Sequence, residues 1–210
     1  MTELLLVRHG ETEWNAGEIF RGRADVSLNE KGVVQAKQLG EYLKNSRLEA
    51  VYSSPLQRAV CTAEKIAKPH SLDVRIDPAL IDMDYGEWQG MPLAEVRKIY
   101  KNLYIKWVRS PENVKFPGGE DLDNVKNRSV ATVNKIVKEH KGSVVLVSHR
   151  VVNKVLICFL MGLDNFHFWN IRQETCGISS FSYEEGRFIL TKHNDTSFLG
   201  GLSGEGQNDF

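Results

Sequence analysis

Two short apolar runs, at residues 4–7 and 144–147, have the length and composition of strands that are buried within a sheet. Shorter strand patterns occur at residues 51–52 and 74–76, and residues 178–183 and 187–192 flank Glu185 and Gly186 as a β-hairpin at a sheet edge would. Helical patterns separate these strands, at residues 29–44, 55–67, 92–108 with a break near Asn102, 122–139 and 151–161. This alternation of strands and helices predicts a layered α/β protein.

Both apolar runs end in a histidine: Arg8 and His9 follow the first, and His149 follows the second. Ligands of open α/β sheets bind beyond the carboxyl ends of the strands, so we expect these side chains in a ligand crevice. A third strand ends in S-S-P-L-Q-R, where Pro55 suits the first position of a helix and Arg58 would lie on its first turn. An acidic loop at residues 80–90 adds carboxyl groups, and loops on a rigid scaffold often carry catalytic residues.

Six motifs follow one another along most of the chain: R-H-G-E-T-E-W-N at residues 8–15, S-L-N-E-K-G-V-V-Q-A at 27–36, S-S-P-L-Q-R-A at 53–59, G-E-W-Q-G at 86–90, P-G-G-E at 117–120 and S-H at 148–149. In this order they resemble the histidine phosphatase superfamily, also called the phosphoglycerate mutase-like family, over residues 4 to about 199. The resemblance implies a three-layer α/β/α fold with a mostly parallel central sheet, in a single domain over residues 1–199. It also implies a small helical cap over the site, at roughly residues 92–120.

The residue types at the strand ends suit the transfer of a phosphoryl group. A phosphate monoester carries about two negative charges near neutral pH, and its transfer depends mostly on positioning and on stabilising charge. Arg8 and Arg58 can each present a planar fork of donors to the phosphoryl oxygens. We expect His9 to be the nucleophile, because a neutral imidazole can form a phosphohistidine and nearby cations disfavour its protonated form. His149 would be a further donor to the transferring phosphoryl group.

A carboxyl group is needed to protonate the leaving oxygen and later to activate water. The family resemblance places this acid, usually a glutamate, four residues before the first glycine of G-E-W-Q-G, and that position is Asp82. Aspartate is one methylene shorter than glutamate. Either the backbone therefore approaches the phosphoryl group more closely, or Asp84 or Glu87 takes the role instead.

Substrate contacts are expected from the loops around these residues. Arg150 stands directly after the second histidine, where the family most often has glycine; it would either bind an anionic group such as a carboxylate or point to solvent. Arg21 and Gly22 lie in a loop of the first motif region, where the family more often has glutamine at position 21. Thr12 and Asn15 are expected to contact phosphate or substrate, because the family's first loop folds over the phosphate.

Composition limits the kinds of partner. Lys and Arg total 27, as do Asp and Glu, so the formal net charge is zero and no basic excess indicates nucleic-acid binding. The longest apolar stretch falls short of the roughly 20 residues that a membrane span needs, and no signal-like region opens the chain, so we expect a cytoplasmic protein.

The spacing of histidines and cysteines gives no H-x-x-x-H, H-E-x-x-H or C-x-x-C group, so we expect neither a metal nor another cofactor. Exposed apolar residues on the cap or the hairpin edge are compatible with a homodimer. Residues 200–210 are glycine-rich and polar, which favours a flexible tail.

These observations favour a phosphatase that hydrolyses a small phosphorylated metabolite through a phosphohistidine. The chain is similar to metal-independent phosphoserine phosphatases and alpha-ribazole phosphatases, and sugar phosphates are a further substrate class. A cofactor-dependent phosphoglycerate mutase would use the same residues, but the true mutases look longer in the cap region. A catalytically inactive, phosphate-binding regulatory module would require the loss of a catalytic residue, and the four expected ones are present: Arg8, His9, Arg58 and His149.

Overall fold

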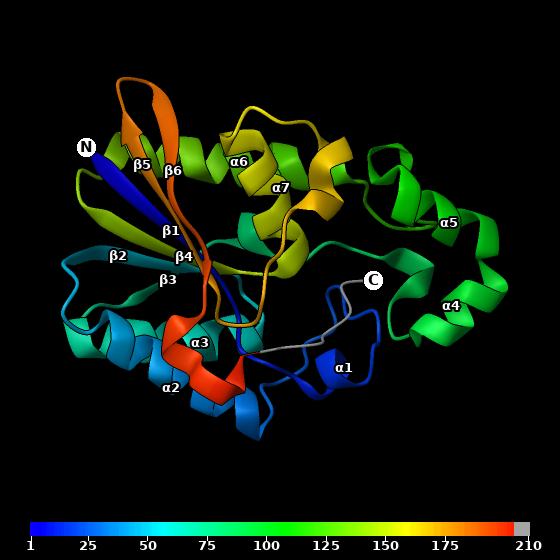
Figure 1. The fold of residues 1–210 in the computed structure, drawn as a ribbon, viewed down its shortest axis with the longest axis horizontal. Helices are drawn as coiled ribbons and strands as arrows, with labels where there is room; N and C mark the ends of the chain where they lie inside the picture. Colours follow the sequence, from blue (N-terminus) through cyan, green and yellow to red (C-terminus); the bar gives the residue numbers. More distant parts are fainter. Residues whose placement is uncertain (204–210) are drawn as a thin grey trace.

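A six-stranded sheet forms the centre of the protein in a computed structural model, which describes residues 1–203 (Figure 1). Its strand order is β3-β2-β4-β1-β5-β6. The strands are β1 Thr2–Arg8, β2 Leu48–Ser53, β3 Val74–Ile76, β4 Ser143–Ser148, β5 Ile178–Glu184 and β6 Arg187–Asp195. The first four strands pair in parallel, and β5 and β6 add an antiparallel hairpin at one edge. The predicted, mostly parallel sheet is confirmed.

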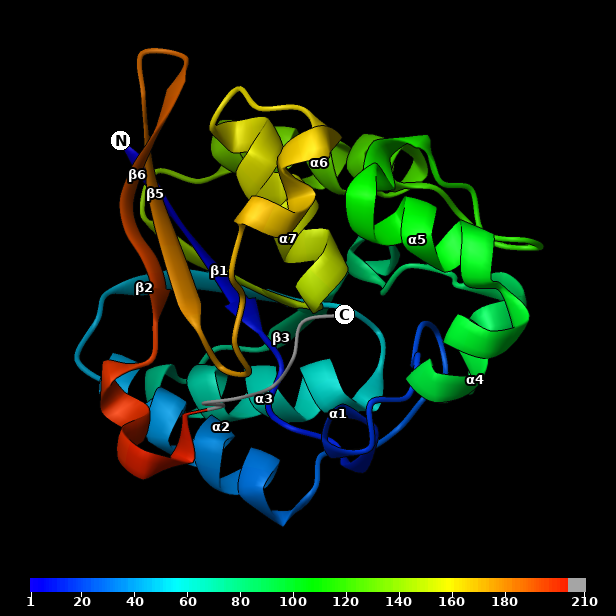
Figure 2. The ribbon, with the colours of Figure 1, turned by 45° about the vertical axis from the view of Figure 1, so that its right-hand side comes forward.

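Helices cover both faces of the sheet, which confirms the three-layer fold (Figures 1 and 2). One face carries α2 (Glu30–Leu43) and α3 (Gln57–Ala67), and the other carries α6 (Leu122–Glu139) and α7 (Arg150–Leu160). Side chains alternate along β1, so Leu4 and Leu6 enter one hydrophobic core whereas Leu5 and Val7 enter the other. Burying one such side chain contributes about 1.5–3 kcal/mol. The apolar runs seen in the sequence therefore hold both helical layers to the sheet.

Two shorter helices, α4 (Leu93–Ile99) and α5 (Lys101–Arg109), lie to one side of the sheet (Figure 2). The helical pattern breaks at Tyr100, close to the predicted break near Asn102. Phe116 packs edge-on against two buried tryptophans, with ring centroids 4.8 Å from Trp88 and 5.1 Å from Trp107. This aromatic cluster anchors α5 and the loop that follows it. That these elements cap a ligand stays a prediction.

The helix after β2 begins later than predicted. α3 starts at Gln57, and Leu56 is its N-cap. The Ser54 hydroxyl accepts a hydrogen bond from the Leu56 backbone N–H at 3.3 Å, which closes a turn ahead of the helix. Pro55 therefore precedes the helix and does not occupy its first position, but Arg58 still lies on the first turn.

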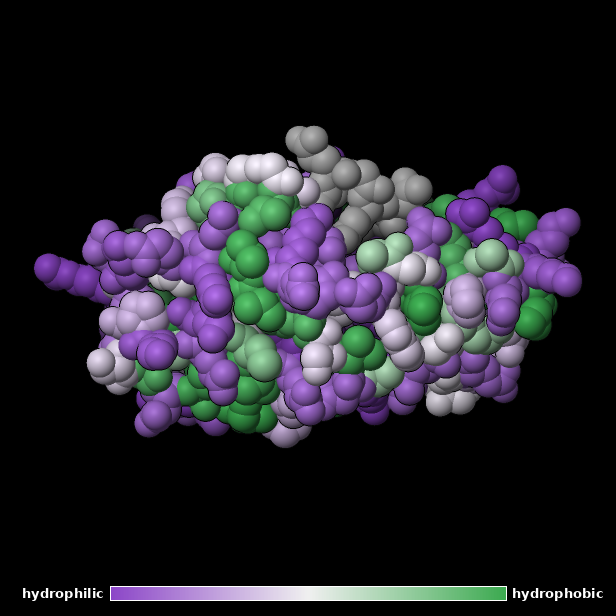
Figure 3. Space-filling view, turned by 90° about the horizontal axis from the view of Figure 1, so that it is seen from below, coloured by the Kyte–Doolittle hydropathy of each residue, from purple (hydrophilic) through white to green (hydrophobic). Residues whose placement is uncertain are grey.

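The last described residues form η6 (Ser197–Leu202), which packs against α2. The Gln35 Nε2 group donates a hydrogen bond to the Leu202 carbonyl at 2.8 Å, so residues 200–202 of the expected tail are held on the domain. Residues 204–210 of that tail lie outside the described residues. Seen from the α2 side, the surface is mainly hydrophilic with hydrophobic side chains between the hydrophilic ones (Figure 3). Such a mixed outer face is typical of amphipathic helices on a sheet.

Candidate active site

His9 and His149 are neighbours because β1 and β4 are adjacent parallel strands. Arg8 pairs with Ser148 across the two strands, and the His9 N–H donates to the Ser148 carbonyl at 3.0 Å. The next residue on each strand is then a histidine, and the two imidazole centroids are 5.1 Å apart. The strand β2 ends at the same edge and adds Ser54. The structure thus brings together the strand ends that the sequence singled out.

The His9 imidazole is buried and held in one tautomer. Its side chain is 1% exposed, and Nδ1 donates to the Gly10 carbonyl at 2.6 Å, so Nε2 carries the lone pair. Burial lowers the pKa of His9 well below its usual value, and the positive charges of Arg58 and other neighbours lower this pKa further. His9 is therefore neutral at neutral pH, with a free nitrogen available for attack.

Two arginines flank the histidines and are fixed by backbone carbonyls. Arg58 is fully buried; its Nη1 donates to the Ala24 carbonyl at 2.7 Å and its Nη2 to the Gly22 carbonyl at 2.8 Å. Arg8 Nη1 donates to the Gln173 carbonyl at 2.5 Å. Burial lowers the pKa of Arg58, whereas the Asp82 carboxylate raises it. Both guanidinium groups are pre-oriented, which reduces the entropy lost when they bind an anion.

Asp82 is the carboxylate that reaches this cluster. Its Oδ2 lies 3.2 Å from Arg58 Nη2 and 3.6 Å from His149 Nδ1, and its Oδ1 accepts from the Met83 N–H at 2.9 Å. On its other ring nitrogen, His149 is 2.7 Å from the Ser54 hydroxyl. Burial lowers the pKa of His149 well below its usual value, and Arg58 acts in the same direction.

The two alternative acids lie elsewhere. Asp84 accepts from the Gly86 N–H at 2.9 Å and forms an ion pair with Arg23 at 3.4 Å. Glu87 accepts a hydrogen bond from the Tyr100 hydroxyl at 2.7 Å, in an exposed position. Between the alternatives left open by the sequence, the geometry favours Asp82.

Arg128 of α6 fastens the acidic loop to the domain. Its guanidinium donates to two loop carbonyls, those of Ile81 at 2.6 Å and Asp82 at 3.2 Å, and to the carbonyl of Ala79, just before the loop, at 2.7 Å. The same group donates twice to Glu120, at 3.1 Å each. These contacts bring the shorter aspartate side chain toward the histidines by positioning its backbone.

The predicted substrate contacts fall into two groups. Arg21, Gly22 and Arg150 line one pocket together with Asp82. The charge of Arg21 acts on both histidines, and the Gly22 carbonyl accepts from Arg58. Arg150 is buried against this pocket, so it does not point to solvent. Thr12 and Asn15 are buried too, but they form a capping box with each other at the start of α1 (Glu13–Ala16). Their contact with a substrate stays a prediction.

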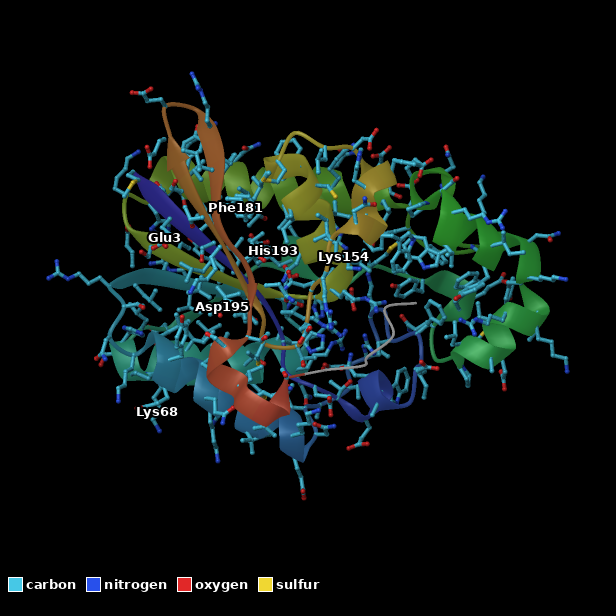
Figure 4. All side chains as sticks on the ribbon, in the orientation of Figure 1. Glu3, Lys68, Lys154, Phe181, His193 and Asp195 are labelled. Carbon is cyan, nitrogen blue, oxygen red and sulfur yellow. The ribbon has the colours of Figure 1, made fainter. Side chains whose placement is uncertain are left out.

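Several contacts of the site join residues that lie far apart in the chain, and local sequence patterns do not reveal these pairings. Gln173, Ser54 and Arg128 hold Arg8, His149 and the acidic loop respectively, across long separations in the chain. Lys154, on α7 one helical turn after Arg150, is buried with its Nζ 4.8 Å from the centre of the Trp169 ring (Figure 4). The sequence signal for Lys154 is its spacing from Arg150, because residues four apart share a helix face.

Acid should destabilise the folded protein through His9 and His149. Both titrate near pH 6.5 when unfolded and have lowered pKa values when folded. Below about pH 6.5 these two histidines bind protons in the unfolded chain but not in the folded protein. The free energy of unfolding therefore falls by up to about 1.4 kcal/mol per pH unit for each histidine. Above about pH 7 the two histidines make no pH-dependent contribution.

Urea unfolding of the wild type and of a His9→Asn/His149→Asn variant between about pH 7.5 and 5.5 measures this effect. The slope of stability against pH should be shallower in the variant. Equal slopes would show that the two imidazoles do not resist protonation.

Within residues 1–203, no helix has the length and apolar character of a membrane span. The same residues contain no group of three or more His, Cys, Asp or Glu side chains arranged to hold a metal ion.

The fold and the site together define a class of α/β protein in which a buried neutral histidine lies between arginines at the ends of parallel strands. The chain belongs to the histidine phosphatase superfamily (branch 1), whose family pattern matches residues 4–196. Phosphoserine phosphatase 1 of Hydrogenobacter thermophilus is 38% identical over 201 residues, which cover 95% of each protein.

Solved structures agree with this assignment. Bacillus stearothermophilus YhfR superposes with a TM-score of 0.90 at 29% identity, covering 95% of this chain and 100% of that one. The alpha-ribazole phosphatase from Shigella flexneri superposes with a TM-score of 0.84 at 26% identity, covering 92% of this chain and 96% of that one. The resemblance found in the six motifs is therefore confirmed.

Proposed function

We propose that this protein is a metal-independent phosphomonoesterase that hydrolyses a small phosphorylated metabolite through a phosphohistidine. The observation that carries this proposal is the state of His9. Its Nδ1 is committed to the Gly10 carbonyl, its Nε2 is free, and its lowered pKa keeps it neutral among arginines. A neutral nucleophile beside cationic phosphate ligands is the combination that phosphoryl transfer to nitrogen requires.

In the first half of the reaction, His9 Nε2 attacks the phosphorus atom. The N–P bond forms as the ester P–O bond breaks, and the leaving alkoxide takes a proton from the Asp82 carboxyl group. Arg8, Arg58 and His149 donate hydrogen bonds to the phosphoryl oxygens as charge develops on them. The phosphoryl dianion competes with the Asp82 carboxylate for Arg58, with which Asp82 forms an ion pair at 3.2 Å.

In the second half, Asp82 acts as a base. It accepts a proton from a water molecule while the water oxygen attacks phosphorus on the face opposite His9. The N–P bond breaks, the electron pair returns to Nε2, and inorganic phosphate leaves. Each cycle consumes one water molecule and restores the neutral imidazole and the protonated carboxyl group.

The substrate class follows from the relatives. Their names include phosphoserine phosphatase and alpha-ribazole phosphatase, and both substrates are small phosphate monoesters. We extend this class to the present chain and include sugar phosphates as a further substrate class in the test panel.

Phosphate release by EDTA-treated protein tests the proposal directly. The panel contains phosphoserine, 3-phosphoglycerate, alpha-ribazole phosphate, sugar phosphates and p-nitrophenyl phosphate. We expect release from at least one metabolite at a rate that added metal ions do not change. Conversion of 3-phosphoglycerate to 2-phosphoglycerate without phosphate release would reassign the protein as a mutase, and activity that returned only with added metal would refute metal independence.

The expectations of a cytoplasmic location, a homodimer and no nucleic-acid partner remain predictions. Cell fractionation and size-exclusion chromatography with light scattering are the measurements that check the first two.

A further inference from the structure

Arg21 is a buried cation close to the two histidines, and its charge acts on both of them. It lies in the loop between α1 and α2 and lines a narrow pocket with Asp82, Tyr85 and Arg150. The side chain is 7% exposed, and its Nε and Nη1 atoms have no hydrogen-bond partner among the described residues. Burial lowers the pKa of Arg21 to about 9, and the charges of Arg8 and Arg150 act in the same direction. A guanidinium in such a place destabilises the protein unless an acceptor reaches it.

The other arginines differ from Arg21 in how they are held. Arg58 donates to two carbonyls and to Asp82, and Arg8 donates to the Gln173 carbonyl. These contacts fix both groups, and the charges of both act on His9. The phosphoryl group therefore has two oriented arginines without Arg21.

Asp82 is the acidic residue in the pocket wall, and its charge raises the pKa of Arg21 but does not offset the effect of burial. Tyr85 is held by a hydrogen bond with Arg150, and burial raises the pKa of the Tyr85 hydroxyl to about 12, so it stays neutral. The Asp82 carboxylate lies 3.2 Å from Arg58 Nη2, with which it forms an ion pair. The part of the pocket wall that Arg21 and Arg150 form is thus positively charged.

We infer that Arg21, with Arg150 beside it, binds a carboxylate of the substrate, so that the protein selects phosphomonoesters of hydroxy acids over those of neutral alcohols. This inference rests on the proposed function. A carboxylate has two coplanar oxygens that match the guanidinium fork. Its single charge matches that of Arg21, whose Nε and Nη1 atoms lack an acceptor among the described residues. A second phosphate would bring about two charges and a bulkier tetrahedral group into a narrow pocket.

The test uses two esters that differ only in the group concerned. 3-Phosphoglycerate carries a carboxylate where glycerol 3-phosphate carries a hydroxymethyl group. We expect the wild type to have a higher kcat/KM for 3-phosphoglycerate, and the Arg21→Gln variant to reduce this preference by about 100-fold, as the loss of a buried charged hydrogen-bonded pair would.

Arg23→Gln is the matched control. It removes the same charge from the same loop, but Arg23 is partly exposed and forms ion pairs with Asp84 and Glu120, away from the pocket. The preference for 3-phosphoglycerate should persist in this variant.

Three outcomes would overturn the inference. Equal losses on both esters in Arg21→Gln would make Arg21 a ligand of the phosphoryl group. The absence of a preference in the wild type would remove the subsite. A stronger preference for a bisphosphate, abolished by Arg21→Gln, would assign the pocket to a second phosphate.

Binding separates this inference from the proposed function. Calorimetry on His9→Ala protein, with and without Arg21→Gln, compares the Kd values of the same two esters and requires no turnover. If the wild type hydrolyses nothing on the panel, the proposed function fails. The ratio of the two Kd values then still supports or refutes a carboxylate subsite at Arg21.

Discussion

Replacing His9 with alanine should lower kcat/KM for every phosphate ester by about 10,000-fold or more, as the loss of other enzymes' catalytic nucleophiles does. The variant loses the atom that forms the N–P bond, and no other described side chain in the site presents an unprotonated nitrogen held by a backbone carbonyl in this way. Arg8, Arg58 and His149 remain, so inorganic phosphate should still bind. Initial rates of phosphate release across the substrate panel, together with calorimetric binding of phosphate, measure both effects.

His167→Ala is the control for this variant. His167 lies on η5 (Asn165–Asn170), partly exposed and 2.8 Å from Asp164, outside the site. Its replacement should leave the rates unchanged within a factor of about two, as for surface substitutions in general. A His9→Ala protein that folds, binds phosphate and keeps more than about a tenth of the wild-type rate would rule out His9 as the nucleophile.

Replacing Asp82 with asparagine should lower kcat for alkyl phosphates by about 100- to 10,000-fold, the range expected for the loss of general acid–base catalysis. Asparagine keeps the shape of the side chain and hydrogen bonding to the Met83 N–H, but it can neither protonate the leaving alkoxide nor deprotonate water. p-Nitrophenyl phosphate needs little protonation of its leaving group. With this ester, the variant should therefore release a burst of nitrophenol and then stall as the phosphoenzyme.

The controls for Asp82 are the two neighbouring carboxylates. Asp84→Asn and Glu87→Gln alter groups that contact Arg23, the Gly86 N–H and Tyr100, and neither contacts the histidines. Stopped-flow absorbance on all three variants distinguishes the acids. If Glu87→Gln or Asp84→Asn showed the burst and Asp82→Asn did not, the assignment of the acid would be wrong.

The sequence predicted the fold well where physical signals are local. The runs that became β1 and β4 are continuous and apolar, because both faces of these strands are covered by helices. The positions of Arg8, His9 and His149 followed from those strand ends. Arg58 was also placed correctly, although Pro55 lies in a turn closed by Ser54 before the helix begins. A proline therefore indicates the region in which a helix begins more reliably than it indicates the first helical residue.

The parts of the site that could not be predicted depend on contacts between distant segments. Arg128 donates hydrogen bonds at the acidic loop, and Ser54 contacts His149. No sequence pattern reveals either pairing. Nor could one sequence tell whether Arg150 faces solvent or pocket, since both positions suit the first turn of a helix. The burial of Arg21 depends on how its loop packs against Tyr85 and Gln89, which local propensity does not determine.

Rapid quenching of the reaction with a ³²P-labelled ester is the most direct test of a phosphohistidine phosphatase at this site. Within one turnover, in the presence of EDTA, the label should appear on the protein in an acid-labile, base-stable linkage that maps to His9, and Asp82→Asn should accumulate more of it than the wild type. Hydrolysis at full rate without labelled protein, or label on any residue other than His9, would contradict the account.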